Sequence, residues 1–342
     1  MYFLKNDYSE GAHPAVMAAL ERTNLEATVG YGLDPYCAAA AEAIRRRFAC
    51  PGADVHFLVG GTQTNFTAIS AFLRPWEAVV AASTAHIAVH ESGAIEATGH
   101  KVYVLPTPDG KLTPALIREA VMAHRTGTEE HMVLPRMVYL SESTELGTVY
   151  TLDELTAIRG VCRELGLYLY LDGARLSCAL TCGSCGIEPE DLPRLCDAFY
   201  IGGTKNGLLF GEALVIVREE FKPYFRNCLK QRGAMLAKGR LLGVQFQAAM
   251  EDDLWLRLGE HANRMAAGLR EGIRAAGWSF LADSPTNQIF PIFPQTMVDR
   301  LAADFAFEEF DALPGGMRAI RLVTSWATTE ETVSAFLAAL RG

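Results

Sequence analysis

The alternation of short apolar runs with helical patterns restricts the fold of this chain more than any other feature of its sequence. Each run is rich in β-branched or aromatic residues, as buried strands are. The runs lie at 55–59, 78–81, 101–105, 137–140, 167–171, 198–201 and 213–217. Helical spacing of apolar residues separates several of them, and this order is typical of a parallel sheet covered by helices. We therefore expect an α/β fold with a mostly parallel, seven-stranded sheet.

The clearest helical pattern covers residues 152–165. The apolar positions that recur there at helical spacing are Leu152, Leu155, Ile158, Val161 and Leu165. Thr151 and Glu154 have the spacing of a capping box, and Gly166 is a typical residue to follow a last helical turn. The sequence therefore predicts a helix that leads into a strand ending at Asp172.

The pattern changes at about residue 243. The segments that follow are a long helical stretch through 275, short strands around 280–293 and 318–324, and a closing helix from about 328. A chain of 342 residues is long enough for about two domains. We expect a large domain of residues 1–242, N-terminal segment included, and a smaller C-terminal α+β domain of residues 243–342.

Charge and hydropathy exclude two classes of partner. The 31 basic and 40 acidic residues give a net charge of −9, with no basic stripe to bind a phosphate backbone, so we expect no nucleic-acid partner. The N-terminus carries charge at Lys5 and Asp7, too early for the apolar core of a signal peptide, and no run of about 18 uncharged apolar residues follows. We expect a cytoplasmic protein without a membrane segment.

The eight cysteines are scattered through apolar stretches of a long chain, so reduced thiols are expected. One local cluster comprises Cys178, Cys182 and Cys185. Its Cys-x-x-Cys end could ligate zinc or carry out redox chemistry if a further ligand came from elsewhere. No second Cys-x-x-Cys or His pair lies nearby, so we favour buried structural cysteines and predict no metal site.

The loops after the strands are where a ligand of an open α/β sheet binds. The strand 55–59 leads into the glycines Gly60 and Gly61 and then Thr62, where a helix follows. Backbone N–H groups at such a helix start can bind an anion. A tight turn with Thr62 or Thr64 as the N-cap residue explains the same loop equally well.

Two further strands deliver charged groups to the same edge. Asp172 follows one strand, and Lys205 lies in a loop with Gly202, Gly203 and Gly207 after another. The pair could be a solvated ion pair at the rim of the sheet. The glycines instead favour a ligand that approaches the lysine closely. Pyridoxal phosphate requires an amine, a carboxylate for its pyridine nitrogen and a Gly/Ser/Thr phosphate cup, and the three loops supply that set.

Six motifs in one order carry a family resemblance. They are Gly30-Tyr31-Gly32-Leu33-Asp34-Pro35, Gly61-Thr62-Gln63-Thr64-Asn65, the stretch from His86 to Ala94, Leu171-Asp172-Gly173-Ala174-Arg175, Thr204-Lys205-Asn206-Gly207 and Arg321-Leu322-Val323-Thr324. Over nearly its whole length the chain resembles the low-specificity L-threonine aldolases. These belong to the β-eliminating lyase group of the fold type I, aspartate-aminotransferase-like, pyridoxal-phosphate enzymes.

The resemblance implies roles around pyridoxal 5'-phosphate. Lys205 would form the imine with the cofactor, and Asp172 would pair with the pyridine nitrogen. Gly61 and Thr62 would hold the phosphate, and His86 would stack on the ring. Without the resemblance, a satisfied core histidine would be the better interpretation of His86.

Other positions would bind the substrate or approach a neighbouring subunit. Arg175 and Arg321 would clamp the substrate carboxylate, for which a guanidinium fork is suited. Arg240 would approach the cofactor of a neighbouring subunit, unless it is a solvated helix charge. Tyr31 would also lie near a neighbour's cofactor and contribute to the substrate site. The resemblance thus implies a homo-oligomer, and we expect a tetramer built from dimers.

The chain departs from the family pattern at two positions near the expected substrate pocket. Glu145 stands where the bacterial members have a histidine in an Asn-Thr-His-Asn-Gly loop, and Asn6 stands where a serine is common. Glu145 could handle the substrate β-hydroxyl, or only cap its turn. An unperturbed glutamate has a pKa of about 4.3, so without a shift it would give no acidic limb near neutral pH.

The expected activity is cleavage of L-threonine, L-allo-threonine or a related L-β-hydroxy-α-amino acid to glycine and an aldehyde. The same scaffold also supports β-elimination and amino transfer, because a fold does not fix a reaction. A non-enzymatic protein that binds the cofactor is the third alternative. Lys205, Asp172 and Arg175 are all present, which favours an enzyme.

Overall fold

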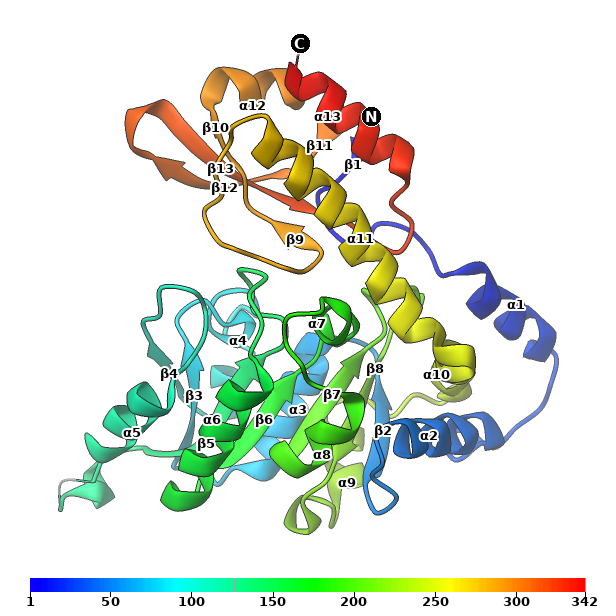
Figure 1. Ribbon diagram of the computed structural model, residues 1–342. Coiled ribbons are helices and arrows are strands. Elements are labelled where there is room, and N and C mark those ends of the chain that lie inside the picture. Colours follow the sequence, from blue (N-terminus) through cyan, green and yellow to red (C-terminus); the bar gives the residue numbers. More distant parts are fainter. Residues whose placement is uncertain (126, 342) are drawn as a thin grey trace.

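The computed structural model describes residues 1–125 and 127–341, and its largest element is a seven-stranded sheet (Figure 1). The strand order is β2-β8-β7-β6-β5-β3-β4, and only β8 runs antiparallel to its neighbours. The strands are β2 (Asp54–Leu58), β3 (Glu77–Ala82), β4 (Val102–Leu105), β5 (Leu134–Ser141), β6 (Tyr168–Asp172), β7 (Ala198–Gly202) and β8 (Glu212–Ile216). All seven runs predicted from the sequence are strands, and the mostly parallel sheet is confirmed.

Helices cover both faces of this sheet, with α3 on one face and α6, α7 and α8 on the other (Figure 1). The helices up to the end of the sheet are α1 (Pro14–Thr23), α2 (Pro35–Arg47), α3 (Gly61–Phe72), α4 (His86–Val89), α5 (Pro114–Met122), α6 (Leu152–Leu165), α7 (Leu176–Thr181), α8 (Leu192–Leu195) and α9 (Phe225–Gln231). Helix α6 has the predicted bounds. The Thr151–Glu154 capping box is formed, and Gly166 takes the left-handed conformation with φ of 70°.

The C-terminal part has its own small antiparallel sheet. Strand β13 (Met317–Val323) pairs with β12 (Glu308–Leu313), β10 (Ile292–Pro294) and β9 (Gln288–Ile289). The helices packed around it are α11 (Leu254–Ala275), α12 (Gln295–Leu301) and α13 (Glu330–Arg341). The short strands and the closing helix expected in this region are therefore present.

The long helix expected through residue 275 is in fact two helices, α10 (Arg240–Met250) and α11. Between them Asp252 and Asp253 have φ of 49° and 52°, in the left-handed region, so the chain cannot continue as one helix. Periodicity alone did not reveal this break, because apolar residues continue on both sides of it.

The N-terminus crosses from one part of the molecule to the other. Strand β1 (Tyr2–Phe3) pairs with β11 (Phe305–Ala306), and the backbone N–H of Val323 donates to the carbonyl of Leu4. The chain then continues into α1, which packs against α10. Residues 2–4 therefore belong structurally with the C-terminal part, which the sequence pattern did not indicate.

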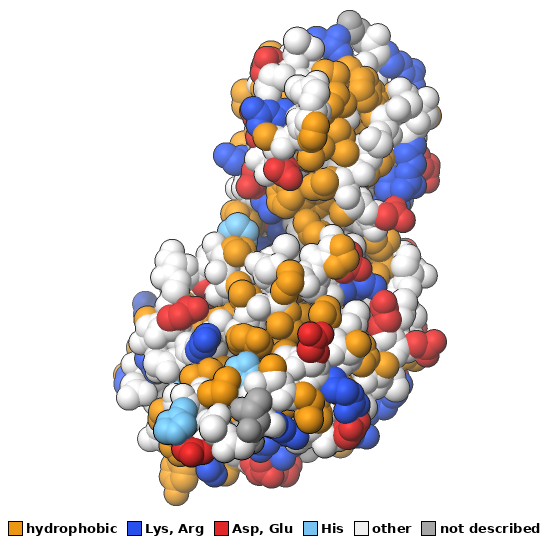
Figure 2. Space-filling view, turned by 90° about the vertical axis from the view of Figure 1, so that its left-hand side faces the viewer, with side chains coloured by type: hydrophobic (Ala, Val, Ile, Leu, Met, Phe, Trp, Pro, Cys, Tyr) orange, Lys and Arg blue, Asp and Glu red, His pale blue; other side chains and the backbone are white. Residues whose placement is uncertain are grey.

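Two separate apolar clusters correspond to the two parts of the molecule. The first surrounds the large sheet and extends to Trp255, and the second contains Leu4 and residues from Ala266 to Leu340. Figure 2 shows the two parts as lobes joined by a narrower neck. Helix α11 extends from one lobe into the other (Figure 1). The two clusters support a two-domain organisation, and the division at residues 242 and 243 stays a proposal.

Candidate active site

The carboxylate of Asp172, at the C-terminal end of β6, accepts hydrogen bonds from four donors. Its Oδ1 accepts from the Tyr200 hydroxyl at 2.5 Å and the Ala174 N–H at 3.0 Å. Its Oδ2 accepts from the Tyr139 hydroxyl at 2.5 Å and the Asn65 amide at 3.0 Å. Burial raises the pKa of Tyr139 and that of Tyr200 well above the usual tyrosine value, so both hydroxyl groups remain protonated and donate. Asp172 is only 4% exposed and is held rigidly as an acceptor.

A chain of side chains links Asp172 to His86 at the start of α4. The Asn65 amide donates to Asp172 and, at 2.8 Å, to Oε1 of Glu91. The same oxygen lies 2.8 Å from Nδ1 of His86. The Tyr170 hydroxyl donates to the Asn65 carbonyl oxygen and so fixes the orientation of that amide. A carboxylate partner at Nδ1 orients the imidazole ring and leaves its opposite nitrogen available.

Lys205 follows β7 in the glycine-containing loop, as predicted. Burial and the nearby charge of Arg175 lower the pKa of its amine, which favours the neutral, nucleophilic form. Glu212 lies close enough for its charge to act on the lysine, and it accepts from the Gly203 N–H at 3.0 Å and the Thr204 hydroxyl at 2.8 Å. Burial raises the pKa of Glu212 to about 8. The amine of Lys205 is therefore buried, and the charges of Arg175 and Glu212 both act on its pKa.

The glycine loop after β2 forms the N-terminus of α3. The N-cap residue is Gly60, with no side-chain cap, so the alternative of Thr62 or Thr64 as the cap is wrong. The Thr64 hydroxyl instead donates back to the Gly60 carbonyl from within the first turn. A Cβ atom on Gly61 would lie 2.9 Å from the Tyr200 hydroxyl. Glycine is required there because the helix start packs directly against a donor to Asp172.

Arg175 is held by an aspartate that the sequence did not single out as a site residue. Its Nε and Nη2 donate to the two carboxylate oxygens of Asp7 at 2.6 and 3.0 Å, and Asn287 donates to the same carboxylate at 2.9 Å. Burial would raise the pKa of Asp7, but the charges of Arg175 and Lys205 outweigh it and lower that pKa. Nη1 makes no hydrogen bond to the described residues. The end of the guanidinium that carries Nη1 is therefore free to bind another anion.

Arg321, on β13, lies near Arg175. Its Nη2 donates to Glu308, while its buried Nε has no hydrogen-bond partner among the described residues. Burial and the charge of Arg175 lower the pKa of Arg321. Two partly buried guanidinium groups lie close together, and one of them has an unpartnered donor, so they form a site that a carboxylate would complete.

Glu145 lies in the loop after β5, and its side chain contacts the start of α4. Its Oε1 accepts from the Ser141 hydroxyl at 2.7 Å and from the backbone N–H of His86 at 2.8 Å. Burial, reinforced by the charge of Asp172, raises its pKa above the usual glutamate value. The pH profile was expected to lack an acidic limb near neutral pH only if the pKa of Glu145 were unshifted. That pKa is raised, so this expectation does not apply.

The side chain of Asn6 stabilises the turn formed by residues 6–9. Its side-chain oxygen accepts from the Tyr8 N–H at 3.1 Å and from the Ser9 hydroxyl at 2.7 Å. Asp7 immediately follows it, so the conformation of this turn sets the position of the carboxylate that holds Arg175.

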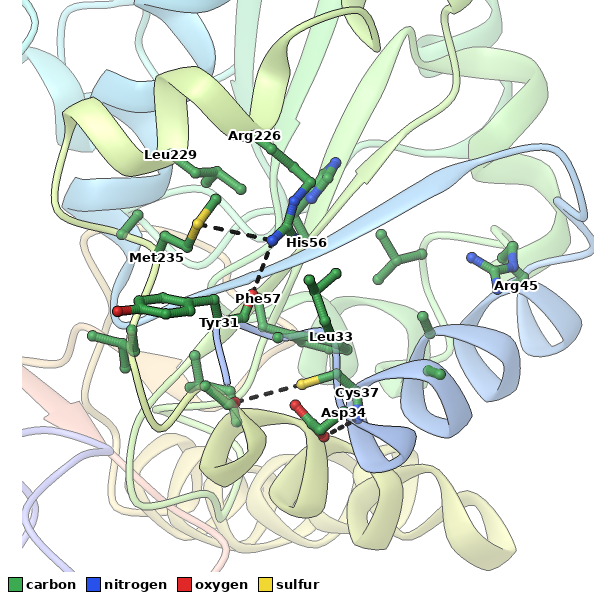
Figure 3. Close-up of a pocket in the computed structure, with 18 residues that line it drawn as sticks. Tyr31, Leu33, Asp34, Cys37, Arg45, His56, Phe57, Arg226, Leu229 and Met235 are labelled. Atoms are coloured by element: carbon green, nitrogen blue, oxygen red, sulfur yellow. Dashed lines mark hydrogen bonds between the residues drawn. The ribbon is translucent and has the colours of Figure 1, made fainter. Parts of the chain in front are cut away.

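Tyr31 and Arg240 lie outside this group of residues in the described chain. Tyr31 lines a pocket of about 310 Å³ between α2, β2 and α9, where its carbonyl oxygen accepts from Arg226 at 3.0 Å (Figure 3). Arg240 donates to the backbone carbonyls of Glu26 and Asn24 at 2.7 and 3.0 Å. Neither makes a hydrogen bond or ion pair with Asp172 or Lys205 within one copy of the described chain.

Several polar residues of the site escaped the sequence analysis. Tyr139 and Tyr200 lie in runs that were predicted only to be buried strands. A buried tyrosine hydroxyl usually has a hydrogen-bond partner, so these two residues could have indicated a polar site. Asn65 belongs to the Gly61–Asn65 motif, but the resemblance implied no role for it. Asp7 and Glu212 gave no signal, because their partners are distant in sequence or in another loop.

The comparisons with known proteins decide the family. The family model for β-eliminating lyases matches residues 4–294. The chain belongs to the β-eliminating lyase family. A low-specificity L-threonine aldolase of Pseudomonas aeruginosa is 35% identical over 97% of this chain and 94% of that protein. One of Saccharomyces cerevisiae is 27% identical over 83% of this chain and 73% of that protein.

Solved structures agree with this family and confirm the expected fold type. A structure described as a threonine aldolase of Leishmania major superposes with a TM-score of 0.98 at 49% identity, covering 100% of this chain and 99% of that one. Aspartate aminotransferase from Thermus thermophilus has a TM-score of 0.73 at 18% identity, covering 99% and 90%. The β-eliminating lyase chain thus has the aspartate-aminotransferase-like fold.

In the part of the chain that the structure describes, no helix is both long and apolar enough to span a bilayer. Within residues 1–125 and 127–341, no group of three or more His, Cys, Asp or Glu side chains is arranged to hold a metal ion.

Proposed function

We propose that this lyase uses pyridoxal 5'-phosphate to cleave the Cα–Cβ bond of L-β-hydroxy-α-amino acids such as L-threonine, giving glycine and an aldehyde. The observation that carries the proposal is the pair of partly buried guanidinium groups, one with an unpartnered donor, beside a lysine of lowered pKa and an aspartate that accepts four hydrogen bonds. The relatives from Pseudomonas aeruginosa and Saccharomyces cerevisiae are low-specificity L-threonine aldolases, which supports the same substrate class for this chain.

The donors and acceptors of the site fit the cofactor. Asp172, whose oxygens already accept four hydrogen bonds, would keep the pyridine nitrogen protonated, and Lys205 would bind the aldehyde carbon covalently. Gly61 and Thr62 would hold the phosphate at the N-terminus of α3, and His86 would lie against the ring. When bound, the cofactor accepts the electron pair that the broken Cα–Cβ bond leaves on Cα.

The two arginines would orient the amino acid by its carboxylate. Asp7 holds one edge of the Arg175 guanidinium, which leaves the Nη1 end for a substrate oxygen. The unpartnered Nε of Arg321 would supply a second donor. A carboxylate between the two guanidinium groups would offset their mutual repulsion, so binding an α-amino acid is favoured over binding a simple amine.

Glu145 would accept the proton of the β-hydroxyl as the carbon–carbon bond breaks. Its raised pKa makes the ionised carboxylate a stronger base than an ordinary glutamate, and Ser141 and the His86 N–H hold its Oε1 in place. The Glu91-oriented imidazole of His86 is the neighbouring group that could relay that proton.

The decisive experiment supplies L-threonine to protein saturated with pyridoxal phosphate and measures glycine and acetaldehyde. Lys205→Ala should abolish turnover, whereas Lys101→Ala, at an exposed lysine beside β4, should not change it. Borohydride reduction followed by peptide mapping should place the pyridoxyl group on Lys205. A label on Lys111, Lys230 or Lys238 would refute the assignment.

The same assay separates the alternatives on this scaffold. Pyruvate and ammonia from L-serine, without glycine from L-threonine, would identify a β-eliminating activity, and a keto acid formed with an amino acceptor would identify a transaminase. Cofactor binding without turnover of any amino acid would identify a non-enzymatic protein.

We further propose a homo-oligomer, a tetramer built from dimers, in which Arg240 and Tyr31 reach the cofactor site of a neighbouring copy. The resemblance to the aldolases supports this arrangement, and within the described chain the hydrogen bonds of both residues go to groups other than Asp172 and Lys205. We also propose that the protein is cytoplasmic.

A further inference from the structure

The turn that follows α7 brings together two cysteines that the proposed chemistry does not use. Cys182 is the C-cap residue of α7, and Cys185 comes three residues later. Gly183 and Gly186 have φ of 74° and 63°, left-handed values that fold the chain back on the end of the helix. The sequence spacing Cys-x-x-Cys therefore becomes a tight turn.

Both cysteines converge on one backbone carbonyl. The N–H of Cys182 donates to the carbonyl of Ala179 at 3.4 Å, and the Cys185 thiol donates to the same oxygen at 3.1 Å. The two side chains are also near enough for each to shift the pKa of the other. Helix α11 fixes this end of α7, because Asn263 donates to the Cys178 carbonyl at 2.7 Å. The two sulfurs are thus close together on a rigid support.

The two thiols differ in environment in the way that stepwise disulfide exchange requires. Cys182 is partly exposed, and the hydrogen bond from Cys185 lowers its pKa to about 6, so it is a thiolate at neutral pH. Cys185 is 2% exposed, and the hydrogen bond to Cys182 together with burial raises its pKa. The exposed sulfur is therefore the nucleophile, and the buried sulfur remains protonated behind it.

A buried carboxyl group completes the cluster. Glu142 is 1% exposed, and its Oε1 has no hydrogen-bond partner among the described residues. Burial raises its pKa well above the usual value, and it lies near enough to both cysteines for their charges to interact. A carboxyl group whose pKa is raised opposes a thiolate at Cys182 less than an ordinary glutamate would.

We propose that Cys182 and Cys185 form a redox-active dithiol that a small-molecule disulfide such as oxidised glutathione converts to an intramolecular disulfide. The Cys182 thiolate attacks one sulfur of the disulfide and releases one thiolate, which leaves a mixed disulfide on Cys182. Cys185 then loses its proton, attacks the Cys182 sulfur and releases the second thiol. Both cysteines are oxidised, and one molecule of the small disulfide is reduced to two thiols.

The dithiol has no role in the proposed amino-acid cleavage. It lies at the far end of α7 from Arg175, which precedes the helix. Its test therefore reads sulfur chemistry directly, and its result stands whichever reaction the lyase catalyses.

The experiment treats the full-length holoenzyme with oxidised glutathione, alkylates the remaining thiols and digests the protein with trypsin. The peptide spanning residues 176–194 contains Cys178, Cys182 and Cys185. We expect its alkylated thiols to fall from three to one, with a Cys182–Cys185 crosslink that dithiothreitol reverses. Cys228, the other partly exposed cysteine, is the internal control and should form at most a mixed disulfide.

Two conservative variants test the order of the steps. Cys185→Ser should accumulate a stable glutathione adduct on Cys182, and Cys182→Ser should form neither adduct nor crosslink in this peptide. A Cys178–Cys182 crosslink, a persistent adduct in the wild type, or modification no faster than that of Cys228 would each overturn the proposal. The wild-type measurement decides the matter even if a variant folds poorly.

Discussion

The buried ion pair between Asp7 and Arg175 gives the sharpest test of the site's energetics. Asp7→Ala removes both hydrogen bonds to the guanidinium and leaves Arg175, whose side chain is 11% exposed, without its carboxylate partner. Breaking a buried pair in this way costs ~3–5 kcal/mol, because the remaining charge is uncompensated. We therefore expect a large loss of stability from a substitution at a residue that belongs to neither apolar cluster.

The expected shift in melting temperature follows from the size of the chain. An unfolding entropy of ~2.1 cal/mol/K per residue gives ~0.7 kcal/mol/K for a chain of this length, so Asp7→Ala should lower Tm by ~4–7 °C. The matched control is Glu164→Ala, which breaks a bidentate pair with Arg118 at 2.6 Å that is exposed on both sides. That control should leave Tm nearly unchanged, since solvent screens the pair.

The pH dependence supplies the second readout. The pKa of Asp7 is lowered in the folded protein, so the pair contributes its full stability above the unfolded aspartate pKa of about 3.9 and loses it as the pH falls through the lower folded value. The difference between wild type and Asp7→Ala, followed by calorimetry, should thus be constant near neutrality and shrink in acid. A Tm loss no larger than that of Glu164→Ala would refute the reasoning.

Three further predictions concern catalysis and assembly. In steady-state kinetics, Asp172→Asn should lower kcat far more than it raises KM. Arg321→Ala should mainly raise KM. Equally small effects of the two substitutions would contradict both assignments. Because burial raises the pKa of Glu145, activity should fall as the pH drops through that raised value, and Glu145→Gln should remove this limb and alter the ratio of threonine to phenylserine cleavage. Light scattering should detect an oligomer, and Arg240→Ala should weaken cofactor binding measured by absorbance; a fully active monomer would exclude shared sites.

The parts of the fold that local signals specify were predictable from the sequence. Helix α6 matched at both ends because its capping box and Gly166 act within a few residues of each helix terminus. Strands β1 and β11 were not predictable, since each has two residues and its partner lies about 300 positions away. The break at Asp252 was missed because the conformation of two residues, and not hydropathy, ends α10.

The site divides in the same way. Lys205, Asp172 and the Gly61 loop were found because each follows a recognisable strand at one edge of the sheet. The residues that orient them, such as Asp7 and Asn65, act through side chains that only the folded chain brings together. A polar residue in an otherwise ordinary segment carries no sign of its distant partner.

The placement of the first strand has a consequence for the order of events during synthesis. Residues 2–4 are made before residues 304–306 and Val323, with which they pair. All seven strands of the large sheet precede those partners in the chain. The large sheet can therefore assemble during translation while residues 2–4 wait for β11 and β13.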